Sequence, residues 1–214
     1  ILIVMIKIIT ILIIIFPLNL FSQGFEGLIT FNISHSNIDS SKKELDIMPS
    51  KLNFYISGEL ARVDQFTKIG IQTTIIDTLS KKHILLIDLM EKKFGIILTN
   101  LEDSNEIEKI RYTNEIAAFS TIECKKAIIN NLNLSNNRTS ISTVYYTNEI
   151  SNSYNVNFKG LNGFPLKYEI VSENIISTYT IVDCINKKID SKLFEIDKNT
   201  LIYTMEDFKA LMRQ

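Results

Sequence analysis

Hydrophobic and polar residues alternate along most of the chain with a period of two. The first such stretch places four hydrophobic side chains on one face, at Phe25, Ile29, Phe31 and Ile33. Polar residues take the opposite face, a pattern that is typical of a strand with one buried side. Residues 51–57 repeat it, and Gly58 with Glu59 then leads into residues 60–66. These two segments predict a β-hairpin.

The middle of the chain predicts an antiparallel meander. Three segments rich in β-branched and aliphatic residues follow one another, at 70–78, 83–90 and 94–99. The charged turns between them are short, whereas a parallel crossover needs about a dozen residues. Further strands are expected at 123–130, 140–147, 165–172 and 175–189. Residues 130–138 read as a polar loop, and Asn162 with Gly163 as a turn.

Two regions do not show the pattern of a strand with one buried face. Residues 100–120 alternate charges with single aliphatic residues, which leaves a solvated loop and a short surface helix as alternatives. Near the C-terminus, Thr204 precedes Asp207 by three positions, and hydrophobic residues then share a helical face, so we expect a helix over residues 205–213. The chain therefore predicts a mainly β fold, a single curved antiparallel sheet of about 9–11 strands with a short C-terminal helix.

The first 22 residues have the pattern of a secretory signal peptide. Lys7 is their single charge, an apolar run covers residues 8–16, and Pro17 follows. Cleavage is expected after Ser22, which leaves residues 23–214 as a single domain; Met5 is the more natural start of translation. The alternative is a membrane anchor, for which the apolar stretch is short against the ~20 residues of a span.

Composition excludes several classes of protein. With 23 Lys and Arg against 24 Asp and Glu and 45% hydrophobic residues, the chain is neither disordered nor an electrostatic binder of nucleic acid. After the signal, the apolar runs are too short for a stable membrane span, because acidic residues such as Asp88 interrupt them. We therefore expect an exported protein, periplasmic or secreted.

The residues that could carry chemistry are few. His35 and His83 are expected to be exposed at strand ends, and the spacings of zinc sites, serine nucleophiles and phosphate loops are missing. We expect no catalytic residue, no metal and no cofactor. Lysines beside Cys124 could activate its thiol by lowering its pKa. In an oxidising compartment, however, a Cys124–Cys184 disulfide is favoured. Such a disulfide would stabilise the folded state by about 4 kcal/mol. An enzyme would require perturbed carboxylates, or His83 beside Cys124 in a pocket.

Several short motifs, taken in order, resemble a known family. They are Phe25–Phe31 after the signal, Ile122–Ala127 with the letters IECKKA, Val144–Thr147 with VYYT, Phe158–Leu166 with FKGLNGFPL, and Phe194–Ile196. The order is similar to that of a family of secreted bacterial envelope proteins of unknown function, related to the group named for its GLPGLI motif, where this chain reads GLNGFP. That family distantly resembles the lipoprotein-localisation carriers (LolA/LolB-like), which implies an unclosed half-barrel.

Two functions remain from this reading. The first is a non-enzymatic protein that binds a lipid-like or hydrophobic ligand, or an acylated partner, in the concave face of the sheet. The alternative is an envelope structural or protein-interaction module without a small ligand, whose apolar residues simply pack against each other. The sequence assigns no ligand-binding residues to either.

Overall fold

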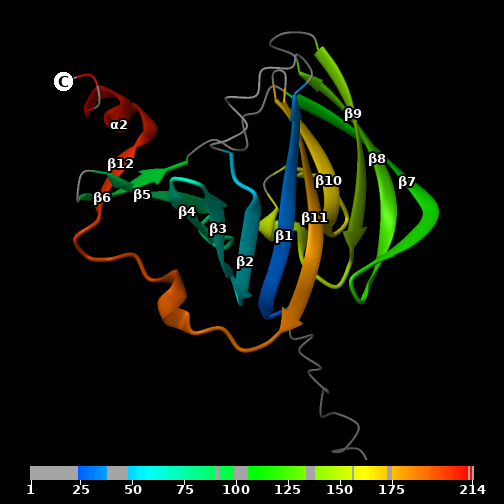
Figure 1. Cartoon of the computed structure of the whole chain (residues 1–214), viewed down its shortest axis with the longest axis horizontal. Coiled ribbons are helices and arrows are strands. Elements are labelled where there is room, and N and C mark those ends of the chain that lie inside the picture. The colour runs from blue at the N-terminus through cyan, green and yellow to red at the C-terminus, as the bar shows by residue number, and fades with distance from the viewer. Residues whose placement is uncertain are drawn as a thin grey trace, which may run out of the picture.

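The protein is built on one large curved sheet (Figure 1). The computed structural model describes residues 24–37, 48–89, 92–98, 106–133, 138–155, 157–172, 175–211 and 213. Their strands form a 12-stranded sheet in the order β12-β6-β5-β4-β3-β2-β1-β11-β10-β9-β8-β7. Among the described strands, β12 and β7 lie at opposite edges, so the sheet does not close into a barrel. The predicted mainly β fold class is confirmed.

One half of the sheet is the predicted meander. Its strands are β2 (Lys51–Ser57), β3 (Leu60–Thr67), β4 (Gly70–Asp77), β5 (Lys82–Leu89) and β6 (Lys92–Ile97). Each pairs antiparallel with the next. The β2–β3 turn places Gly58 at φ +57°, a conformation that glycine adopts without steric cost.

The other half is a second antiparallel series that the N-terminal strand joins to the first. It contains β7 (Glu106–Phe119), β8 (Ile122–Asn133), β9 (Arg138–Thr147), β10 (Phe164–Ser172) and β11 (Ile175–Asn186). β1 (Gly27–Asn37) pairs with β2 on one side and with β11 on the other. Its inward side chains Ile29, Phe31 and Ile33 are buried, so β1 anchors the centre of the core.

A long connection fills part of the concave side. Between β9 and β10 the segment 148–163, which includes η2 (Asn152–Tyr154), buries four side chains in the main core cluster: Ile150, Tyr154, Phe158 and Leu161. The inward residues of the strands belong to the same cluster. We call residues 148–163 the inner segment. It takes the place of a second layer over the sheet.

The chain after β11 crosses the outer side of the meander. There η3 (Ser191–Phe194) packs against β3, and Phe194 is buried. Arg62 donates to the Asp64 carboxylate at 2.8 Å and to the Leu193 carbonyl at 3.0 Å, and Thr73 donates to Asp64 at 2.7 Å. This polar network holds the crossing segment against the sheet.

The crossing segment ends in β12 (Leu201–Thr204) and α2 (Met205–Leu211). β12 pairs parallel with β6, and Phe208 of α2 contacts Phe94 edge to face, with ring centroids 5.8 Å apart. The predicted C-terminal helix is confirmed, although its regular part ends at Leu211. The sheet is therefore antiparallel except at this edge.

Three expectations need correction. The sheet has 12 strands, not about 9–11, because β7 and β12 were not predicted. β7 covers the stretch for which a loop or helix was expected; it is an edge strand whose exposed positions accept charged residues. Within the polar stretch 130–138 the described residues are strand, since β8 continues to Asn133 and β9 begins at Arg138.

The predicted signal peptide lies outside the described residues, and so its cleavage stays a prediction. Within the described part of the chain, no helix has both the length and the apolar character that a membrane crossing requires.

Candidate functional site: an apolar pocket on the concave face

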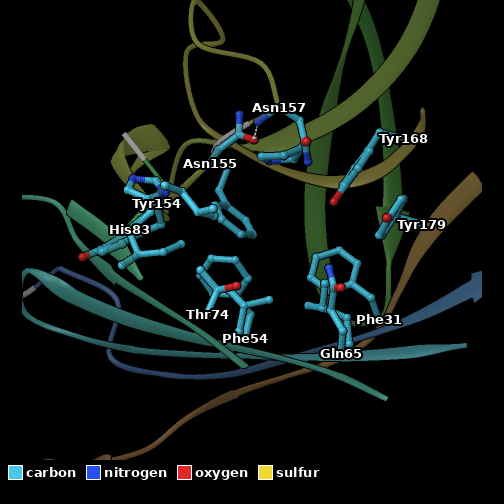
Figure 2. A pocket seen from close by; sticks show the side chains of 16 residues that line it. Phe31, Phe54, Gln65, Thr74, His83, Tyr154, Asn155, Asn157, Tyr168 and Tyr179 are labelled. Carbon is cyan, nitrogen blue, oxygen red and sulfur yellow. Dashed lines mark hydrogen bonds between the residues drawn. The ribbon is translucent and has the colours of Figure 1, made fainter. Parts of the chain in front are cut away.

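A pocket with a volume of about 190 Å³ lies between the sheet and the inner segment. The sheet contributes side chains from β1 to β5, β10 and β11, and the inner segment contributes Tyr154, Asn155 and Asn157. Figure 2 shows Phe31, Phe54, Thr74 and Gln65 on one side, with the inner segment opposite them. His83 lies at one end, and Tyr168 and Tyr179 lie at the other.

The walls are mainly hydrophobic because the strands turn their apolar alternate residues inward. Phe54 from β2 meets Phe164 from β10 edge to face, with ring centroids 5.1 Å apart. Val63 and Ile76 line the floor from β3 and β4, and both are buried. Edge-to-face aromatic contacts of this kind hold ring positions as well as burying area. The walls are therefore ordered by their own packing.

A tyrosine pair closes one end of the pocket. Tyr168 and Tyr179 are direct partners in the β10–β11 ladder, and their rings stack with centroids 4.7 Å apart and planes at 9°. Burial raises the pKa of both phenols, so they stay neutral at physiological pH. Tyr168 also contacts Phe31 and Phe158 edge to face. This end offers aromatic surface without charge.

Hydrogen bonds hold the inner segment in place over the pocket. The Tyr154 hydroxyl donates to the Gly58 carbonyl in the β2–β3 turn. Asn155 donates from Nδ2 to the Phe158 carbonyl and to Asn152 Oδ1, both at 2.9 Å, and accepts from the Asn157 backbone at 2.9 Å. The Asn155 amide is thus committed to the segment's own conformation.

His83 and His35 are only partly exposed, contrary to expectation. His83 faces the pocket from β5, opposite Ile76, and burial lowers its pKa. His35 bridges separate elements, since Nε2 donates to the Pro49 carbonyl at 2.7 Å and Nδ1 lies 2.9 Å from Ser177 Oγ. A carbonyl can only accept, which places a proton on Nε2. His35 has a structural role, whereas His83 belongs to the pocket.

The two cysteines lie on strands that are not neighbours. Cys124 is on β8 and Cys184 on β11, with β9 and β10 between them. Three strand spacings amount to about 14 Å along the sheet, whereas a disulfide joins Cα atoms less than about 7 Å apart. Both thiols are free in the structure, and burial raises the pKa of each to about 11. The geometry does not favour the predicted Cys124–Cys184 bridge.

Among the described residues that line the pocket, the imidazole of His83 is the group that an enzyme could use. The described lining includes no carboxylate and no thiol, so Cys124 does not join His83 there. Within the described residues, no cluster of three or more His, Cys, Asp or Glu side chains could hold a metal ion. The expected absence of catalysis and of cofactors stays a prediction.

The sequence analysis did not identify the residues that line the pocket, although the alternation of apolar and polar residues shows which side chains point inward. Inward positions follow from the alternation, and His83 shares the inward register of Leu85 and Ile87 on β5. Which inward residues remain uncovered depends on where the inner segment lies. That placement requires contacts between distant residues, such as Tyr154 with Gly58, that no local pattern shows.

Comparison with known proteins identifies no family. No family model matches the chain, and no curated protein matches it by sequence. Among solved structures, the chain is similar to a LolA superfamily protein from Nitrosomonas europaea, with a TM-score of 0.39 and 12% sequence identity. The similarity covers 82% of this chain and 91% of that one. The resemblance to the GLPGLI group stays a prediction.

Proposed function

We propose that this protein is an exported, non-enzymatic binder of a small hydrophobic ligand, or of the acyl chain of a larger one, in the concave pocket. The observation that carries the proposal is the pocket itself, which is apolar, aromatic and bounded by buried side chains from distant strands. Ligand sites characteristically combine such walls with a few polar groups. The signal-like sequence of residues 1–22 supports export.

The size of the pocket limits what it can enclose. Its volume of about 190 Å³ is below the ~300–1,000 Å³ of sites that enclose drug-sized ligands. We therefore expect one short hydrocarbon chain or a small ring to fit inside, with the remainder of a larger ligand outside. A bulky multi-chain lipid is not expected to be enclosed whole.

Thr74→Phe tests the site directly. Thr74 lines the pocket from β4, and a phenyl ring there occupies the ligand's space while suiting a strand. We expect the delipidated protein to bind N-phenyl-1-naphthylamine saturably, and Thr74→Phe to weaken the affinity at least tenfold. The measurement is a fluorescence titration, with circular dichroism and thermal melting to verify folding.

Thr143→Phe is the matched control, because Thr143 is exposed on β9 and does not line the pocket. It should bind as wild type does. If folded wild-type protein shows no saturable binding, or folded Thr74→Phe binds as tightly as wild type, the pocket is not a ligand site. The envelope interaction module then becomes the better reading.

A further inference from the structure

We propose that the pocket selects ligands whose polar group is uncharged, such as a hydroxyl, an ester or a carboxamide, over those that carry a carboxylate, a phosphate or an ammonium group. The inference rests on the proposed function and specifies the ligand class for the same site. It follows from which side chains line the pocket and from which of their polar atoms remain available.

The described part of the lining offers no counter-charge. Its 16 residues are hydrophobic, aromatic or neutral polar, and none of them is Lys, Arg, Asp or Glu. A charged head group that enters such a site loses its hydration and finds no opposite charge to replace it. A neutral polar group loses less, and hydrogen bonds can compensate for that loss.

The polar side chains available to a ligand include Gln65, Thr74 and His83. Within the described part of the chain they form no hydrogen bond with other residues, and none of their polar atoms is sealed from solvent. Gln65, Thr74 and a neutral imidazole can each donate and accept. Burial lowers the pKa of His83, so its ring is neutral at pH 8.

The strand register places these three side chains in a line. Thr74 pairs with Val63 on β3, two residues from Gln65, and with Leu85 on β5, two residues from His83. Gln65, Thr74 and His83 are therefore successive diagonal neighbours, about 7–8 Å apart. A head group with several neutral oxygens or nitrogens can reach two of them, while its hydrocarbon chain lies on the aromatic wall around Phe54 (Figure 2).

Ten-carbon ligands with different head groups test the selection. Displacement of N-phenyl-1-naphthylamine at pH 8 is measured with 1-decanol, decanamide, decanoate and decyltrimethylammonium. We expect the two neutral ligands to displace the dye at least tenfold more effectively than either ion. Equal or better displacement by an ion overturns the inference and leaves the proposed function intact. Failure of the dye itself to bind is the distinct result that removes the proposed function.

A charge-introducing variant separates head-group recognition from overall hydrophobicity. Gln65→Lys places a cation inside the pocket and should improve decanoate relative to decanol at least tenfold, whereas Thr143→Lys adds the same charge on the exposed side of β9 and should not. No gain for decanoate in folded Gln65→Lys contradicts the inference.

If Gln65→Lys does not fold, Thr74→Val is used. It should weaken decanol and decanamide at least threefold relative to decanoate, and an unchanged ratio contradicts the inference.

Discussion

The imidazole of His83 is the group whose charge changes near neutral pH among the described residues that line the pocket. The other titratable side chains there are Tyr154, Tyr168 and Tyr179, and burial raises the pKa of each phenol, so all three stay neutral. Burial acts in the opposite direction on His83, whose pKa falls because its charged form is the one that loses hydration. Acidification therefore introduces a positive charge into an otherwise uncharged pocket.

Protonation of His83 is therefore expected to lower the stability of the folded protein in mild acid. Because the pKa of His83 is lower in the folded state than its ordinary value of 6.5, the unfolded chain binds the proton more readily. Stability is thus full above about pH 6.5 and falls as the pH drops toward the folded-state pKa. We expect the urea midpoint to decrease between pH 7.5 and 5.5, and His83→Gln to reduce that decrease. An identical pH dependence in folded His83→Gln would place the cause elsewhere.

At the scale of elements, the inner segment depends on the tight turn through which it enters β10. Gly163 has φ +146°, and its nitrogen donates to the Leu161 carbonyl at 2.9 Å. The Tyr112 hydroxyl of β7 donates to the Gly160 carbonyl at 3.2 Å and accepts from the Asn162 backbone at 3.0 Å. The segment is therefore held by its own turn and by the edge strand beside it.

Gly163→Ala is expected to destabilise the protein and to weaken ligand binding together. A Cβ at this position would overlap the Thr147 carbonyl, and its φ is one that residues with side chains rarely adopt. Strain of this kind costs about 1–3 kcal/mol. Urea unfolding and the dye titration measure the two effects. Gly24→Ala is the control, since a Cβ there meets nothing within 4 Å; a Gly163→Ala midpoint equal to that of Gly24→Ala would argue against the role of this turn.

At the scale of the whole molecule, the sheet keeps two edges apart and a concave face between them (Figure 1). β1 lies between β2 and β11, and the chain after β11 returns across the outer side to pair β12 with β6. The same order separates Cys124 from Cys184 by two intervening strands. Sheet order therefore leaves the concave face between two separate edges and places the two thiols on strands that are not neighbours.

Intact mass spectrometry of protein purified from the cells that produce it tests these whole-molecule expectations. We expect a chain that begins at Gln23, and alkylation of both thiols after unfolding without reductant, because both are free in the structure. A mass 2 Da lower with no alkylation would establish the disulfide predicted from the sequence. Under native conditions, an additional mass that is lost on denaturation would identify the ligand.

The local pattern of residues was enough to predict most of the strands and the mainly β sheet that they build. Alternation at residues 51–57 and short charged turns act locally, so the meander and the C-terminal helix could be predicted closely. β7 could not, because few residues of this edge strand are buried, and its single aliphatic residues among charges fit a loop or a surface helix as well as a strand. No local pattern predicted the parallel pairing of β12, the inward position of His83 within a pocket, or the inner segment that bounds that pocket. Each depends on contacts far apart in the sequence, such as Arg62 with Leu193 and Tyr154 with Gly58, whose partners the chain brings together only when it folds.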